Sequence, residues 1–213
     1  MRKMSVLVIS LILAGCGGKQ EANQSNFSEA INEFAKNDHV CLPVNLILDN
    51  VENGSKSNPA VGAPEIRITL KNSNGDRVNK TAVEQMAILT DADIYQQGKN
   101  EDFQLPNGKK LPVAVYRLSD KAKDKIVTSS QNLLLCLGTQ QVEKITLFTE
   151  PTPANGVTVS KVVYDAKLVP EKWAEKLLKK TDENWWKSLK EPQRRTAVLV
   201  LTDKGWKDER TLH

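Results

Sequence analysis

The fold is decided by residues 132–149, NLLLCLGTQQVEKITLFT, and by residues 157–168, VTVSKVVYDAKL. Apolar and β-branched side chains dominate both stretches, which predicts strands at 132–137, 141–149 and 157–168, with another at 196–201. Gly138-Thr139-Gln140 predicts a hairpin turn between the first two strands, and residues 151–156 predict a connector to the third. The C-terminal half therefore predicts an antiparallel sheet.

One long helix is predicted between the last two of these strands, at residues 170–189. Pro170 stands just before its start, and a break is expected around Thr181-Asp182. Trp173, Leu177, Leu178 and Trp185 form its apolar face. At least one of Trp185 and Trp186 is expected to face outward, because neighbouring residues on a helix point about 100° apart.

The N-terminal half reads as helix, strand and helix. A helix beginning near Phe27, capped by Asn26 or Ser28, carries apolar residues at helical spacing. Strands are predicted at 42–48, 66–70 and 111–118, a helix at 81–89 and a short helix at 120–127. Residues 49–64 and 98–107 are expected to be loops, and the polar tail after Trp206 is expected to fray. The fold class is therefore α+β, with a mixed half at 26–130 packed on a strand-rich half at 131–213 as one compact unit.

Three cysteines occur in the chain, and two of them lie in apolar runs. Cys41 is flanked by Val40 and Leu42, and Cys136 by Leu135 and Leu137. If Cys16 is set aside for the role given below, an even pair remains, which favours a disulfide in an oxidising compartment. The alternative is two buried free thiols.

The N-terminus has the layout of a secretory signal. Arg2 and Lys3 precede an apolar run of about ten residues, whereas a membrane-spanning helix needs roughly 20. Leu13-Ala14-Gly15-Cys16 resembles the lipobox of bacterial lipoproteins. The resemblance implies a signal peptide at 1–15 and lipid on Cys16. Residues 17–25 are rich in Gly, Gln and Asn without an apolar period, which predicts that 16–25 is a lipidated, flexible tether. Because Gly17 and not Asp follows the cysteine, resemblance to Gram-negative sorting implies the outer membrane.

A second resemblance covers residues 81–125, which are similar to part of a winged helix. The helix at 81–89 is followed by Tyr116-Arg117-Leu118-Ser119-Asp120-Lys121-Ala122-Lys123, similar to the wing ending Y-x-L-T-x-x-G-K, from which Ser119 and Ala122 depart. DNA reading requires cations on the docking helix. Residues 81–89 carry Glu84 and no Lys or Arg, so the resemblance implies a scaffold and no nucleic-acid partner.

The charge of the chain points to an ordinary solvated surface. The formal net charge is +4, of which Arg2 and Lys3 contribute two, so +2 remains once the signal is removed. Lys and Glu are interleaved, as in residues 172–180. This pattern is typical of a mixed solvent-exposed face and not of a nucleic-acid-binding patch.

The sequence offers no recognised catalytic motif. The two histidines, His39 and His213, form no zinc-binding pair, and there is no Cys-x-x-Cys motif. There is no Gly-x-Ser-x-Gly elbow and no glycine-rich phosphate loop. Asp91-Ala92-Asp93 lacks the later residues of a calcium loop. We therefore expect no metal, no cofactor and no enzymatic activity.

The leading hypothesis is a lipid-anchored outer-membrane protein with a non-enzymatic binding or structural role, its partner an envelope protein or the cell wall. Trp185 and Trp186 are candidate partner-binding residues, with packing of the helix on the sheet as the alternative. One further hypothesis is an immunity or inhibitor lipoprotein that blocks a secreted toxin. Another is an envelope hydrolase with a carboxylate site outside the known motifs.

Overall fold

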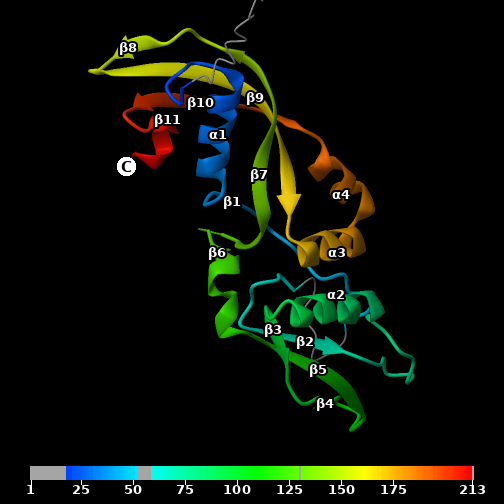
Figure 1. The fold of residues 1–213 in the computed structure, drawn as a ribbon. Helices are drawn as coiled ribbons and strands as arrows, with labels where there is room; N and C mark the ends of the chain where they lie inside the picture. The colour runs from blue at the N-terminus through cyan, green and yellow to red at the C-terminus, as the bar shows by residue number, and fades with distance from the viewer. Residues whose placement is uncertain (1–17, 52–58, 130, 213) are drawn as a thin grey trace, which may run out of the picture.

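The computed structural model describes residues 18–51, 59–129 and 131–212. The predicted signal peptide and Cys16 lie outside these residues. The described chain is a mixed α+β structure with two antiparallel sheets (Figure 1). The α+β class and the antiparallel C-terminal sheet predicted from the sequence are therefore confirmed. Among the described residues, no helix has the length and apolar character needed to cross a membrane.

The first sheet curls into a half-barrel (Figure 1). Its strand order is β1 (His39–Leu42), β7 (Leu133–Phe148), β9 (Val157–Pro170), β10 (Gln193–Thr202) and β11 (Gly205–Asp208), with β6 (Ile126–Thr128) beside β7 and β8 (Thr152–Ala154) beside β9. All of these pairings are antiparallel. The long strands β7 and β9 form the centre of this sheet.

The hairpin predicted at Gly138 is wrong, because β7 runs through this position as one continuous strand. A Cβ atom on Gly138 would lie 2.2 Å from the carbonyl oxygen of Val169 on β9. The glycine therefore permits close approach of two backbones and does not reverse the chain. Register shifts after Val142 and after Ile145 bend β7 further along its length.

Helix α1 (Gln24–Ala35) lies in the concave side of the half-barrel (Figure 1). Its buried residues Phe27, Ala30 and Ile31 pack against the inner face of the sheet. That face is formed by Ile145, Val162, Tyr164, Ala166, Ala197, Leu199 and Trp206. The helix predicted from Phe27 is confirmed, but its cap is Asn23, whose side chain accepts a hydrogen bond from the Asn26 backbone N–H.

The second sheet has the order β2 (Glu65–Thr69), β5 (Lys110–Leu118) and β3 (Tyr95–Gln97), with β4 (Glu101–Gln104) also paired to β5. Helix α2 (Lys80–Asp91) covers one face through Met86 and Leu89. We call residues 59–118 the α2 lobe. The loop expected at 98–107 is wrong in part, because Glu101–Gln104 pairs with β5.

Two short helices stand where one long helix was predicted. Helix α3 (Lys172–Thr181) ends at Asp182, and α4 (Glu183–Lys190) begins there. The Asp182 carboxylate accepts hydrogen bonds from the backbone N–H groups of Asn184 and Trp185, at 2.8 and 3.0 Å. The expected break is therefore confirmed, with Asp182 as the cap of α4. Figure 1 shows α3 beside α2, between the half-barrel and the α2 lobe.

The predicted disulfide between Cys41 and Cys136 is confirmed. The two cysteines are register partners on β1 and β7. The strand expected at 42–48 is wrong except at Leu42: β1 runs from His39 to Leu42 and stops there, because Pro43 has no N–H to continue the ladder. The short helix expected at 120–127 is a 3-10 helix over Asp120–Lys125 (η1), capped as expected by Ser119, and Ile126–Thr128 belongs to strand β6 instead.

Both ends of the described chain are held more firmly than the sequence suggested. Residues 18–23, expected to belong to a flexible tether, are bonded to the domain: Trp206 Nε1 donates to the Gln20 carbonyl at 3.2 Å. The C-terminal tail, expected to fray, forms a 3-10 helix at Glu209–Thr211 (η2). There the Arg210 guanidinium donates two hydrogen bonds to Asp208, at 2.8 and 2.7 Å.

Candidate functional site

The α2 lobe carries a hollow with an apolar floor and a cationic rim. The floor consists of four half-buried side chains, Leu70, Val78, Val83 and Pro112. The rim carries Lys71, Arg77, Lys80 and Glu84. The volume is about 540 Å³, within the range of ligand-binding clefts. We call these eight residues the cation-rimmed hollow.

A tight turn after β2 positions the rim. Lys71 and Arg77 form an antiparallel bridge, and the Asn72 side-chain oxygen accepts hydrogen bonds from the Asn74 and Asp76 N–H groups, at 3.0 and 2.9 Å. Asn-rich turns of this kind form because the side chain bonds its own neighbouring backbone. The turn therefore holds the two cations on either side of a fixed loop.

The entry into α2 fixes the third cation and the floor. Asn79 is buried and left-handed (φ 58°), and its Nδ2 donates to the Thr69 carbonyl at 2.9 Å. The Val78 N–H donates to the Leu70 carbonyl, and the Leu70 N–H donates to Pro112, at 3.1 and 2.8 Å. Lys80 begins α2 immediately afterwards. Backbone hydrogen bonds thus fix Val78 and Leu70 of the floor to the sheet, and Lys80 of the rim is fixed because it is the first residue of α2.

The charges of the rim are unbalanced. Glu84 forms an ion pair with Lys180, at 2.6 Å. Lys71, Arg77 and Lys80 have no ion pair within the described residues. Cations beside a half-buried apolar floor favour a ligand that combines negatively charged groups with apolar groups.

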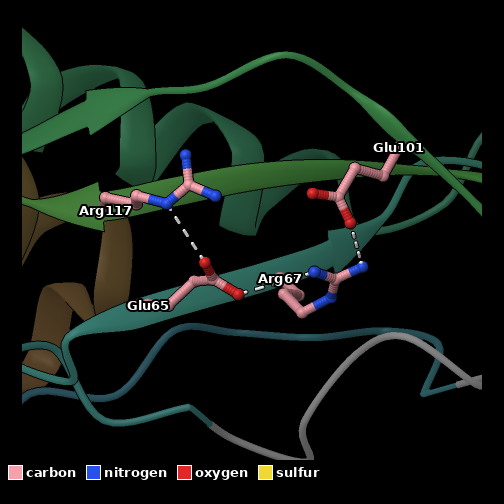
Figure 2. Close-up of polar contacts among 4 residues, drawn as sticks. All are labelled: Glu65, Arg67, Glu101 and Arg117. Atoms are coloured by element: carbon pink, nitrogen blue, oxygen red, sulfur yellow. Dashed lines mark hydrogen bonds and ion pairs between the residues drawn. The ribbon is translucent and has the colours of Figure 1, made fainter.

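A neighbouring charged face of the same lobe is different, because its charges are paired with one another (Figure 2). The Glu65 carboxylate lies between Arg67 and Arg117, at 3.4 and 3.2 Å, and Arg67 also binds Glu101 at 2.6 Å. The hydrogen bond to Glu101 raises the pKa of Arg67. The two glutamates and two arginines of this face have no net charge together. Their ion pairs link β2, β4 and β5 and leave no charge for a partner.

A second hollow opens at the mouth of the half-barrel and contains three arginines. Its volume is about 270 Å³. Arg194 pairs with Asp165 at 3.1 Å, and Arg210 pairs with buried Asp208 while its guanidinium lies 3.8 Å from the Phe34 ring centroid. Two of the three arginines are therefore committed to holding β9, β10 and η2 in place, which makes this hollow the weaker candidate.

The two candidate tryptophans have different environments. Trp186 is 3% exposed and packs in the core with Leu177 and Leu178, so packing, the alternative given from the sequence, accounts for it. Trp185 is half-buried and lines a shallow hollow of about 480 Å³ with Pro43 and Ile47. Of these two candidates, Trp185 is the one that keeps part of its surface exposed.

The other predicted residues that the structure describes lie apart from the hollow. Cys41 and Cys136 are joined to each other and are not free thiols. Cys16 and His213 lie outside the described residues. Over residues 18–51, 59–129 and 131–212, no cluster of three or more His, Cys, Asp or Glu side chains forms a metal site.

The shifted carboxyl groups do not have the raised pKa that a general acid requires at neutral pH. The hydrogen bond from Lys207 lowers the pKa of Glu33. Burial raises the pKa of Glu171, but hydrogen bonds from Lys125 and Trp173 and the charge of Lys125 bring it below its usual range. The hydrogen bond from Lys179 lowers the pKa of Glu175.

Comparison of the chain with protein-family models, with curated proteins and with solved structures finds no significant match. Sequence reasoning missed the cation-rimmed hollow. A signal was present in residues 71–80, KNSNGDRVNK, where an Asn-rich turn is flanked by cations. What the sequence could not show is that Val83 and Pro112 line the same hollow as the residues of that turn.

Proposed function

We propose that this protein is held to the bacterial outer membrane by lipid on Cys16 and binds another envelope protein without enzymatic activity. The observation that carries the binding role is the cation-rimmed hollow, where three unpaired cations surround an apolar floor. A partner that complements this site would present an acidic segment to the cations and apolar side chains to the floor. The lipobox resemblance at Leu13–Cys16 supports the anchor.

Residues 81–125, similar to part of a winged helix, serve in this proposal as a scaffold. Helix α2 supplies Val83 to the floor, and β5 supplies Pro112. Glu84 and Lys80 lie on the same helix, which presents no cluster of cations for a phosphate backbone. The segment thus supports a protein-binding surface and not a nucleic-acid interface.

Photo-crosslinking in intact cells tests the binding site. A photo-reactive phenylalanine analogue at Lys80 should capture an envelope protein, whereas the same analogue at exposed Lys99, in the same lobe but outside the hollow, should not. The double substitution Lys71→Glu with Arg77→Glu should abolish capture at Lys80. Equal capture at both positions, or capture that survives the charge reversal, would contradict the proposal.

The anchor is tested separately. Wild-type protein should incorporate an alkyne-tagged palmitate and fractionate with the outer membrane, and Cys16→Ala should do neither. Incorporation that is unchanged in Cys16→Ala would refute lipid attachment at this cysteine. Because this measurement does not depend on the hollow, it separates failure of the anchor from failure of the binding site.

A further inference from the structure

The first described residues are clasped against the end of the half-barrel. The Gly18 carbonyl accepts hydrogen bonds from the Glu21 N–H and from Asn26 Nδ2, at 2.9 and 3.0 Å. The Gln20 carbonyl accepts from Trp206 Nε1 at 3.2 Å, and Trp206 is only 4% exposed. The chain therefore becomes part of the domain from Gly18 onward.

The turn between β10 and β11 forms the other side of this clasp. A Cβ atom on Gly205 would lie 2.8 Å from the Lys19 carbonyl oxygen, and Gly205 has φ +103°. Glycine is required here both by the left-handed backbone and by the close approach of residue 19. Residues 18–20, 203 and 204 are exposed and thus form one continuous surface, which we call the clasp surface.

The clasp leaves a very short connection to the proposed lipid site. Two Cα–Cα steps separate Gly18 from Cys16, and each spans about 3.8 Å. The connection is therefore no longer than about 8 Å, similar to the thickness of one headgroup layer. If Cys16 carries lipid, as proposed above, the clasp surface stands at the lipid headgroups.

The charges of the clasp surface suit this location. Lys19 and Lys204 are exposed and have no ion pair among the residues that the structure describes. They line a hollow of about 760 Å³ between α1 and the β10–β11 turn, where Lys207 is already paired with Glu33 at 2.5 Å. Asp203 is exposed in the same surface and Glu29 also lines the hollow, so attraction to phospholipid phosphates rests on the two unpaired lysines themselves and not on a large net positive charge.

The opposite end of the molecule carries the proposed binding site. Figure 1 shows the start of α1 at one end of the structure and α2 with β2, β4 and β5 at the other. The cation-rimmed hollow lies in that distant lobe. A domain that stands on the clasp surface would therefore present the hollow away from the bilayer.

We propose that the clasp surface is a membrane-contact surface, in which Lys19 and Lys204 bind phospholipid headgroups and fix the domain upright on the bilayer. The proposal rests on the lipid anchor at Cys16. In this proposal the first described residues are not a flexible tether but an ordered segment that orients the domain on the membrane.

The lipid-free mature protein, Cys16→Ser, tests the surface without the anchor. It should bind vesicles of phosphatidylglycerol and phosphatidylethanolamine, and Lys19→Gln with Lys204→Gln should weaken binding about 25-fold, or about fivefold per lysine. The matched control is Lys99→Gln with Lys176→Gln, two exposed lysines elsewhere, which should leave binding unchanged. Absence of binding, or equal loss in both double variants, overturns the proposal.

The lipidated protein in the same vesicles tests the orientation. A fluorophore on Asp203→Cys, in the clasp surface, should be quenched strongly by a headgroup-linked quencher. A fluorophore on Asn107→Cys, in the turn after β4, should not be quenched. Similar quenching at both positions would mean that the domain tumbles, which contradicts the proposal. Palmitate incorporation at Cys16 in the same preparation shows whether a failure belongs to the anchor or to the surface.

Discussion

Cys41 and Cys136 lie directly opposite each other on β1 and β7 and are joined by a disulfide across 95 residues of sequence. Strand β1 follows α1 and leads into the α2 lobe, whereas β7 is one of the two long strands at the centre of the half-barrel. The bond therefore fastens the chain where it passes from one part of the structure to the other (Figure 1).

Removing this disulfide should reduce the free energy of unfolding substantially. The chain-entropy model gives about 4–5 kcal/mol for a loop of this length, and measured losses are about 2–5 kcal/mol. Chemical denaturation of Cys41→Ser with Cys136→Ser should show this loss, and reduction of the wild-type protein should match it. Cys16→Ser is the control and should unfold like wild type. A double variant as stable as the oxidised protein would refute the prediction.

Substitution of Gly138 should be far more harmful than that of Gly98. A Cβ at Gly138 would meet the Val169 carbonyl at 2.2 Å, and backbone atoms cannot rotate away. We expect Gly138→Ala to lower the free energy of unfolding by about 1–3 kcal/mol or more, because overpacking usually costs this much. At Gly98 the nearest atom would lie 3.5 Å away, so Gly98→Ala should change stability by less than about 1 kcal/mol. Equal denaturation midpoints would contradict this reading.

Gly138 also shows where sequence reasoning ends. Local pattern predicted α1, α2, β5, β9 and the break at Asp182, because periodicity and capping are encoded within a few residues. A glycine between two apolar runs looks the same whether it turns the chain or admits a neighbouring backbone. The choice depends on Val169, about thirty residues away, which no local pattern contains. The cation-rimmed hollow was missed for the same reason, since Leu70, Val83 and Pro112 meet only in the folded lobe.

Trp185 and Trp186 should respond differently to truncation. Trp186 is 3% exposed and packs within the core, so Trp186→Ala should cost about 3–5 kcal/mol of unfolding free energy. Trp185 is half-buried, and its truncation should cost less than about 2 kcal/mol. Thermal or urea denaturation of the two variants makes the comparison. If Trp185→Ala were the more damaging, the assignment of Trp186 to the core would be wrong.

The paired charges on the second sheet should contribute little individually. Glu101 binds Arg67 at 2.6 Å, but both side chains keep about a third or more of their surface exposed. Exposed ion pairs stabilise by about 0.2–1 kcal/mol and are screened by salt. A double-mutant cycle with Glu101→Gln and Arg67→Gln should give a coupling energy in that range, smaller in high salt. A coupling energy above about 2 kcal/mol would show that the pair is better shielded from water than its exposure indicates.

The buried hydroxyl of Tyr95 should make stability depend on pH in the alkaline range. It donates to the Ala63 carbonyl and accepts from the Gly62 N–H, both at 2.8 Å, and burial raises the pKa of Tyr95 to about 12. The folded state therefore holds this proton more tightly than the unfolded chain, whose tyrosine titrates near 10. This contribution is fully present below pH 10 and is lost as the pH rises towards 12.

The variant Tyr95→Phe isolates this effect from the other two tyrosines, Tyr116 and Tyr164, whose pKa values burial also raises. It should cost about 1–3 kcal/mol at neutral pH, because the Gly62 N–H and the Ala63 carbonyl lose their partner. It should also lose less stability than wild type between pH 10 and 12. Parallel decline of the two proteins across that range would show that Tyr95 ionises as easily in the folded state as in the unfolded chain.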